Sequence, residues 1–258
     1  MSTRLKERLA QGRLTRVFCL GHLCSPKWVE IIGLHGGFDA VWLDQEHVGL
    51  NLELIEQTVR AARGCGLDSF VRLAPTDYAT VMRPLEAGAG GVMAAQVRNA
   101  RQAEEFVRWA KFYPRGARGY NSSGIEGRFG TLAMTEYMRR ANADSLVAVQ
   151  IEHAEAVEDV ENIAAIRDLD VLFVGPADLS QSLGVPGEWE HPRFWAAIER
   201  TAQAARKHGI HWAVLPFTPA FARRCVDLGC RMLSLGMDVW AVQKGLRAFQ
   251  EEYADFFS

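Results

Sequence analysis

The residues best suited to chemistry begin in the segment 38–47, which reads Phe-Asp-Ala-Val-Trp-Leu-Asp-Gln-Glu-His. Its first part is an apolar run that is too short for a helix and is typical of a buried strand. The run ends in Asp44, Glu46 and His47, three titratable groups within four residues. Two carboxylates and an imidazole directly after a buried strand are suited to proton transfer. The alternative is an ordinary polar turn with a capping Asp, and the segment alone leaves both interpretations open.

Three other predicted strands also carry polar groups at their carboxyl ends. Arg72 lies in Phe-Val-Arg-Leu, Gln150 and Glu152 end Val-Gln-Ile-Glu, and Asp178 closes Gly-Pro-Ala-Asp. Each has a plain structural explanation, since Asp178 for example is an acid in the first turn of a helix, where the helix dipole favours it. Their coincidence at the ends of four strands favours a functional site.

Glu152 and Asp178 supply hard oxygen ligands from neighbouring strands, with no cysteine nearby. Such ligands suit Mg²⁺ or Mn²⁺, with open positions left for water or substrate, and Co²⁺ is a further candidate. The short helix that begins at Pro176, after Gly175, directs the backbone N–H groups of Ala177 and Asp178 outwards. We therefore expect this turn to bind the carboxylate of a substrate.

The remaining residues complete a proton-transfer site. Arg72, with Gln150 beside it, is expected to bind a substrate oxygen that gains negative charge. His47 is suited to act as the general base, with Asp44 holding its tautomer and orientation. Glu46 is expected to contact a metal-bound water. Together these groups predict a site that enolises a 2-keto acid.

The lysines argue against a Schiff-base route to the same chemistry. The chain has five of them, and none lies within a predicted strand. Only Lys27, after the first strand, and Lys111, before a glycine-rich loop, approach the expected rim. A metal route is favoured.

The elements that must position these residues alternate regularly between strand and helix. Eight strand-then-helix units without a flexible linker predict a single domain over residues 1–258 with the size of a closed (βα)8 TIM barrel. A doubly wound open sheet is the alternative, but the turn after the first strand, residues 21–24, lacks the glycine-rich phosphate-binding pattern. The predicted strands are residues 17–21, 38–44, 69–74, 91–97, 146–151, 171–174, 210–215 and 232–235. The predicted helices are residues 4–14, 27–36, 51–63, 77–87, 99–112, 131–142, 154–167, a short one from 176, 192–208, 219–228 and 238–257.

Two segments interrupt this regularity. Residues 113–130 form a long glycine-rich loop, a kind of segment that tends to be functional or to contact a neighbour. The last helix is markedly apolar at its end, with Phe249, Tyr253, Phe256 and Phe257. We expect it to dock on the barrel wall or on a neighbouring subunit.

Composition narrows the cellular context and the partners. A net charge of −2 without a basic stripe disfavours nucleic acid and anionic membranes as partners. No apolar run approaches the roughly 20 residues of a membrane span, and the first residues lack a signal-peptide core. Five cysteines without Cys-x-x-Cys spacing favour small core residues in a reducing cytosol. We expect a cytoplasmic protein with small-molecule substrates.

The rim motifs together resemble the HpcH/HpaI family of metal-dependent class II pyruvate aldolases. The match rests on Leu-Asp-Gln-Glu-His at 43–47, Val-Arg at 71–72, Val-Gln-Ile-Glu at 149–152 and Val-Gly-Pro-Ala-Asp-Leu-Ser at 174–180. The resemblance implies reversible cleavage of a 4-hydroxy-2-oxo acid to pyruvate, or a related 2-keto acid, and an aldehyde. It places metal carboxylates on Glu152 and Asp178, the base dyad on His47 with Asp44, and the keto-oxygen arginine on Arg72. The carboxylate-binding amides fall on Ala177 and Asp178.

The resemblance also bears on assembly. Family members are barrels whose last helix exchanges between paired subunits, commonly as a hexamer built as a trimer of dimers. It places the loop segment 113–119 near a subunit boundary and the aldehyde end of the site. Departures from the family pattern at Gln45, at 48–49, at Glu86 and at 94–95 border the aldehyde pocket and leave the aldehyde open. Two competing functions remain: a citryl- or malyl-CoA-type lyase on the same barrel, and a barrel that binds a keto acid without turning it over.

Overall fold

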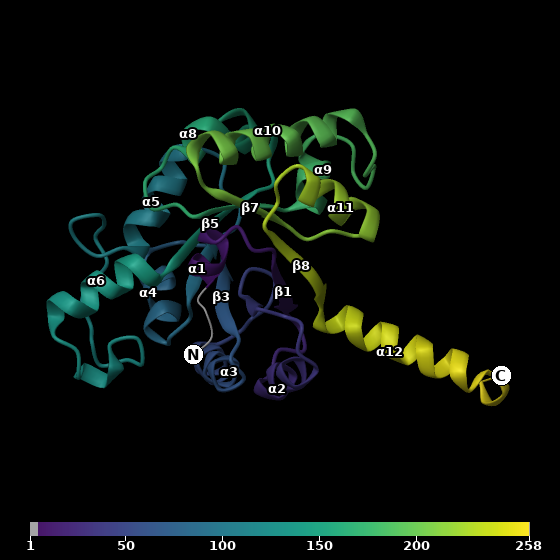
Figure 1. The fold of residues 1–258 in the computed structure, drawn as a ribbon, viewed down its shortest axis with the longest axis horizontal. Coiled ribbons are helices and arrows are strands. Elements are labelled where there is room, and N and C mark those ends of the chain that lie inside the picture. The colour runs from purple at the N-terminus through teal and green to yellow at the C-terminus, as the bar shows by residue number, and fades with distance from the viewer. Residues whose placement is uncertain (1–4, 258) are drawn as a thin grey trace.

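The chain folds into a closed barrel of eight parallel strands, in the order β1 to β8, in a computed structural model that describes residues 5–257 (Figure 1). This confirms the predicted (βα)8 barrel. The strands are β1 (Thr15–Leu20), β2 (Ala40–Asp44), β3 (Asp68–Leu73), β4 (Gly91–Ala94), β5 (Leu146–Ile151), β6 (Val171–Val174), β7 (His211–Val214) and β8 (Met232–Met237). Adjacent strands pair in parallel throughout, so that all eight carboxyl ends form one rim.

Helices surround the barrel and follow the strands in sequence. They are α1 (Leu5–Ala10), α2 (Pro26–His35), α3 (Leu52–Gly64), α4 (Tyr78–Glu86), α5 (Ala100–Ala110), η1 (Arg128–Gly130), α6 (Met134–Asp144), α7 (Ala154–Glu158), α8 (Val160–Ala164), α9 (Pro176–Ser182), α10 (Pro192–His208), α11 (Pro219–Asp227), α12 (Asp238–Glu252) and η2 (Ala254–Phe256). Asn51 and Asn99 cap the starts of α3 and α5, since their side chains accept hydrogen bonds from the backbone N–H groups of Leu54 and Gln102.

Several predicted limits need correction. The last helix, expected over 238–257, ends at Glu252, the helix expected over 131–142 is Met134–Asp144, and the strand expected over 91–97 ends at Ala94. Two further helix predictions differ for a visible reason. The helix expected over 154–167 is broken at Asp159, whose backbone leaves helical geometry at φ −96° and ψ 9°. Its carboxylate accepts a hydrogen bond from the backbone N–H of Ala100 at 2.7 Å, which ties the break to the start of α5. The helix expected over 4–14 stops at Ala10, because Gly12 turns the chain at φ +69°. Position 4 of that prediction lies outside the described residues.

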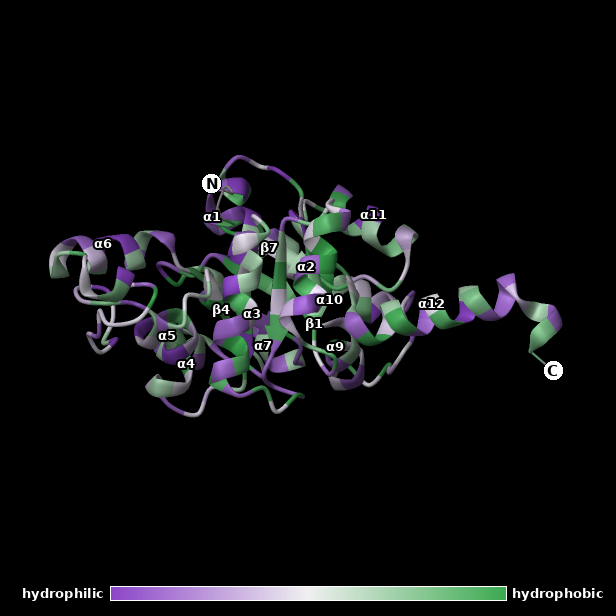
Figure 2. Ribbon diagram, turned by 90° about the horizontal axis from the view of Figure 1, so that it is seen from below, coloured by the Kyte–Doolittle hydropathy of each residue, from purple (hydrophilic) through white to green (hydrophobic). Residues whose placement is uncertain are grey.

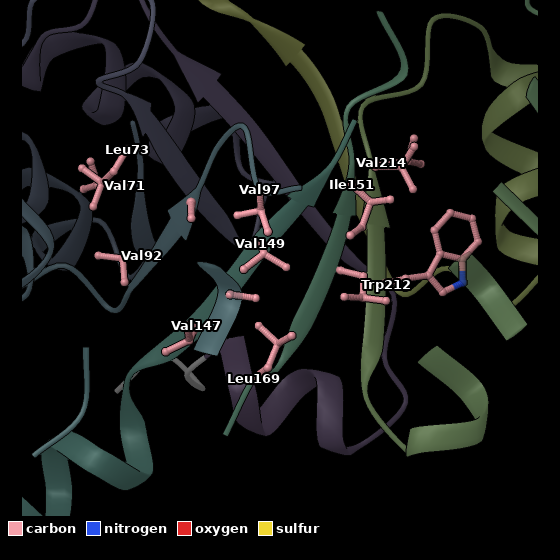
Figure 3. Close-up of a cluster of buried hydrophobic side chains, with 14 of the residues drawn as sticks. Val71, Leu73, Val92, Val97, Val147, Val149, Ile151, Leu169, Trp212 and Val214 are labelled. Atoms are coloured by element: carbon pink, nitrogen blue, oxygen red, sulfur yellow. The ribbon is translucent and has the colours of Figure 1, made fainter. Parts of the chain in front are cut away.

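The core has two layers, as the alternation of side chains along each strand requires. Inward-facing side chains fill the lumen, among them Val17, Trp42, Phe70 and Phe173, and Leu5 and Leu9 of α1 pack against this cluster. Outward-facing residues such as Val71, Val149 and Val214 pack under the helices, as in the cluster drawn in Figure 3. A rigid, filled barrel of this kind holds the rim residues in fixed positions.

The last helix, α12, leaves the barrel and extends away from it, with the C-terminus at its far end (Figure 1). Its first residue, Asp238, is buried and accepts hydrogen bonds from the N–H groups of Gly21 and Leu23 at 2.7 and 2.9 Å. Along the rest of α12, hydrophobic and hydrophilic stretches alternate (Figure 2). Several large apolar side chains on this terminal segment are exposed, namely Leu246, Phe249, Tyr253, Phe256 and Phe257. Within residues 5–257 no helix combines the length and the apolar character that crossing a membrane requires.

Candidate active site at the barrel rim

Asp44 and Arg72 face each other across neighbouring strands, because the register of β2 and β3 pairs these two residues. The Arg72 side chain donates from Nε to Oδ1 at 3.0 Å and from Nη2 to Oδ2 at 2.7 Å. Oδ1 also accepts hydrogen bonds from the backbone N–H groups of Glu46 and His47. Burial alone raises the pKa of Asp44, but the Arg72 hydrogen bonds and charge and these two N–H groups bring it below its usual value.

Glu46 and His47 form a second contact beside this pair. The imidazole Nε2 of His47 lies 3.6 Å from Oε2 of Glu46, and the imidazole side chain is 61% exposed. The same Glu46 oxygen lies 3.0 Å from Arg72 Nη1, although the two atoms are not aligned as a hydrogen bond. Asp44 therefore reaches His47 through its backbone, whereas the His47 ring lies beside Glu46.

Two further side chains, Trp42 and Gln150, contact the guanidinium of Arg72. Its carbon lies 5.0 Å from the ring centre of Trp42, close enough for a cation–π contact. The indole N–H of Trp42 donates to Ser234 Oγ at 2.9 Å across the lumen, which fixes the plane of that ring. Arg72 Nη1 also lies 3.4 Å from Gln150 Oε1. The structure thus brings Asp44, Glu46, Arg72 and Gln150 together as predicted.

Glu152 is fully buried just beyond the end of β5. Its Oε1 accepts a hydrogen bond from the backbone N–H of Gln96 at 2.6 Å, while Oε2 has no hydrogen-bond partner. Burial, and then the charges of Glu46 and Asp178, raise the pKa of Glu152 to about 7, although the Gln96 hydrogen bond opposes the shift. A buried carboxylate oxygen without a partner is costly unless a cation or a proton satisfies it.

The surroundings of Glu152 Oε2 fit a cation. A Cβ atom at Gly175 would lie 2.5 Å from this oxygen, so only glycine leaves the adjoining space open. Asp178, in the first turn of α9, is half-buried, and its charge acts on Glu152. The N–H groups of Ala177 and Asp178 belong to the same turn, where a helix leaves its N–H groups without internal partners. Over residues 5–257, no group of three or more His, Cys, Asp or Glu side chains is arranged to hold a metal.

Lys111, one of the two lysines that approached the expected rim, lies elsewhere. Its ammonium group is fully buried and donates to the backbone carbonyls of Asn142 and Ser145 at 2.9 and 2.8 Å. Ser145 precedes β5, so Lys111 sits at the amino end of the barrel, opposite the rim. Burial lowers its pKa to about 8. Lys111 therefore does not belong to the rim.

Sequence reasoning missed two contributors to this rim. Gln96 has a left-handed backbone at φ +59° and donates its N–H to Glu152. A glutamine in a sequence does not indicate such a conformation. Trp42 was recognised only as part of an apolar strand. Its inward direction beneath Arg72 follows from strand alternation, because Trp42 and Asp44 lie on the same face of β2.

A hollow of about 340 Å³ opens beside Gln96, which lines it together with Thr76 and Ala95.

Comparison with known proteins identifies the family of this chain. A family model described as HpcH/HpaI aldolase/citrate lyase matches residues 17–244, which confirms the resemblance inferred from the rim motifs. Hydroxypyruvate/pyruvate aldolase of Pseudomonas aeruginosa is 32% identical over 245 residues, covering 95% of this chain and 90% of that protein. 5-Keto-4-deoxy-D-glucarate aldolase of Klebsiella pneumoniae subsp. pneumoniae is 31% identical over 242 residues, covering 94% and 92%. The crystal structure of an HpcH/HpaI aldolase from Desulfitobacterium hafniense DCB-2 superposes with a TM-score of 0.90 at 32% identity, covering 97% of this chain and 98% of that one.

Proposed function

This chain belongs to the HpcH/HpaI aldolase/citrate lyase family and is an aldolase, a carbon–carbon lyase. We propose that the residues at its barrel rim form the active site for this reaction. In this proposal a divalent cation binds to Glu152 and Asp178, and the substrate is a 4-hydroxy-2-oxo acid. Cleavage yields pyruvate or a related 2-keto acid and an aldehyde, and the reaction is reversible.

One observation carries the proposal most directly: Oε2 of the fully buried Glu152 has no hydrogen-bond partner and borders the space that Gly175 leaves open. The nearby charge of Asp178 raises the pKa of Glu152, and a divalent cation held by these two residues would offset the repulsion between their charges. Hard carboxylate ligands favour Mg²⁺ or Mn²⁺, with Co²⁺ as a further candidate. A cation bound here would supply a Lewis acid that lowers the cost of negative charge on a keto oxygen.

The residues of the rim bind the substrate and transfer its protons. Arg72, fixed by Asp44, donates to the keto oxygen as negative charge develops there, and Gln150 borders the same position. The N–H groups of Ala177 and Asp178, after Gly175, bind the substrate carboxylate. His47 takes the proton from the 4-hydroxyl group as the C3–C4 bond breaks and the aldehyde forms. A proton then goes to C3 of the released enolate, from His47 directly or through water.

The direct test is to add a 4-hydroxy-2-oxo acid to the purified protein with Mg²⁺ or Mn²⁺ and to measure pyruvate release. We expect release with either cation and its loss when a chelator removes the cation. Full activity in the presence of the chelator would refute the metal assignment. A panel of aldehydes in the reverse direction would identify the acceptor.

The description of the matched family also includes citrate lyase, which keeps the CoA-thioester reaction as the second candidate. Titrating malyl- and citryl-CoA beside free keto acids separates the two, because a CoA lyase would turn over the thioesters preferentially. A barrel that only binds a keto acid would turn over neither.

We further propose that α12 packs against a second copy of this chain, as in the subunit exchange that the family resemblance implies. The exposed apolar residues Leu246, Phe249 and Tyr253 on a helix that extends from its own barrel support this proposal (Figures 1 and 2). A hexamer built as a trimer of dimers is the expected assembly.

A further inference from the structure

Gln96 has an unusual backbone at the edge of the proposed metal site. It follows β4 by two residues and adopts φ +59°, a left-handed conformation that costs energy for residues other than glycine. Strained conformations of this kind persist only where the surrounding structure enforces them, and they cluster at functional sites.

The strain has a visible consequence at Glu152. In this conformation the N–H of Gln96 points at Oε1 and donates at 2.6 Å. Oε1 is thereby occupied, and Oε2 is the oxygen left facing the space beside Gly175. The backbone of Gln96 therefore determines which carboxylate oxygen is free and where it points.

A side-chain contact is available to enforce the strained backbone. Oε1 of Gln96 lies 2.6 Å from Nε2 of His153, the residue that follows Glu152. Gln96 thus contacts two consecutive residues after β5, Glu152 through its N–H and His153 through its side chain. These two contacts join the loop after β4 to the loop after β5.

We propose that Gln96 and His153 together form a clip that positions Glu152 to bind the divalent cation. This inference rests on the proposed function, because it assigns Gln96 and His153 to the same metal site as positioning residues rather than ligands. Groups that orient metal ligands in this way typically change metal affinity by about 10–100-fold when they are removed.

The test is a double-mutant cycle on Mn²⁺ affinity in the full-length protein, measured by calorimetric titration of Mn²⁺ alone. Gln96→Gly keeps the N–H, reaches φ > 0 without strain and removes the contact with His153. His153→Ala removes the same contact from the other side. We expect each single variant to raise the Mn²⁺ Kd at least 10-fold, and the double variant to match the weaker-binding single variant within about twofold.

Thermal unfolding of the metal-free proteins separates positioning from simple support of the fold. Because glycine relieves the strain, we expect Gln96→Gly to keep a Tm within about 2 °C of the wild type, or above it, while its Mn²⁺ affinity falls. Phe129→Gly is the matched control, since Phe129 also has a left-handed backbone, at φ +54°, and its side chain is exposed on η1. It should leave the Mn²⁺ Kd unchanged.

Two affinity results would overturn the inference while the proposed metal site stands. One is an unchanged Mn²⁺ Kd in Gln96→Gly, and the other is a double variant whose loss of affinity equals the product of the two single-variant losses. If Glu152→Gln binds Mn²⁺ as tightly as the wild type, the metal site itself is refuted and the clip is refuted with it. A large drop in the Tm of metal-free Gln96→Gly would assign the residue to fold support instead.

Discussion

The carboxylate of Asp44 and the guanidinium of Arg72 meet at two points, with Oδ1 3.0 Å from Nε and Oδ2 2.7 Å from Nη2. The pairing follows from the register of β2 and β3, and both side chains are almost completely buried. A two-point pair of this kind fixes the plane of the guanidinium as well as its position. The orientation of Arg72 is therefore set before any substrate arrives.

This relationship predicts that charge alone cannot replace Arg72. Arg72→Lys keeps a positive charge but loses the planar fork, so we expect kcat for pyruvate release to fall by about 10²-fold, nearly as far as in Arg72→Ala. Circular dichroism should show that both variants remain folded. Recovery of more than half of the wild-type kcat in Arg72→Lys would show that the two-point geometry is dispensable.

The contact between the His47 ring and Glu46 predicts that Glu46 orients the imidazole. Because the imidazole lies 3.6 Å from Glu46 Oε2, we expect Glu46→Gln to slow proton exchange at the pyruvate methyl group by about 10-fold. His47→Ala should slow it by about 10²-fold. Glu53→Gln, at an exposed acid in α3, serves as the control. If Glu46→Gln exchanged at the wild-type rate, the Glu46 contact would have no part in positioning the base.

Gly175 is predicted to be essential for cation binding although it contributes no side chain. A Cβ atom there would lie 2.5 Å from Glu152 Oε2 and 3.2 Å from Gln150 Nε2. We therefore expect Gly175→Ala to weaken Mn²⁺ binding at least 10-fold in a calorimetric titration. Gly64→Ala is the matched control, because a Cβ at Gly64 meets nothing within 4 Å. Equal Mn²⁺ affinity in the two variants would mean that the space beside Gly175 does not hold the cation.

The buried ammonium of Lys111 predicts a pH dependence of stability. Its pKa is about 8 in the folded protein, below the ordinary value of 10.5, so between these values the unfolded chain binds more protons. The free energy of unfolding should therefore rise with pH over this window, by on the order of 3 kcal/mol from this group. Lys111→Met removes the titration, so the difference between wild type and variant isolates the effect. It is measured by urea unfolding at pH 7 and pH 10, and a difference that stays constant between the two would contradict the lowered pKa.

The exposed face of α12 predicts a change in assembly that leaves the barrel intact. Leu246→Asp combined with Phe249→Asp adds charge to side chains that are 58% and 59% exposed in the single chain. If α12 binds a second copy, multi-angle light scattering should report a smaller assembly for this variant, with unchanged circular dichroism. Gln250→Asp, at another exposed position on α12, should assemble as the wild type does. An unchanged mass for the double variant would exclude this face as the contact.

Much of the fold was predictable because its signals are local. Buried strands such as β5 and β6 are continuous apolar runs, and the predicted limits of both match the structure. Helix starts were marked by capping side chains such as Asn51 and Asn99. The break between α7 and α8 was not predictable, because it depends on Asp159 reaching the start of α5, a contact between segments distant in sequence.

Part of the rim could be placed from the sequence, but the contacts between its side chains could not. The ends of parallel strands meet at one rim, so Asp44, Arg72 and Gln150 could be placed together from strand order alone. Which oxygen each donor meets depends on register and rotamers, and this is why Asp44 was expected beside the His47 ring whereas its carboxylate meets Arg72. The role of Gln96 depends on a backbone angle that its side-chain type does not encode.

We propose that a cation on Glu152 and Asp178 enables this rim to enolise pyruvate. The most direct measurement follows the pyruvate methyl signal by proton NMR in deuterated water, with wild type and Glu152→Gln, each with Mg²⁺ and with a chelator. We predict loss of the methyl signal only for the wild type with Mg²⁺. Exchange at the same rate in chelator, or in Glu152→Gln, would contradict the claim.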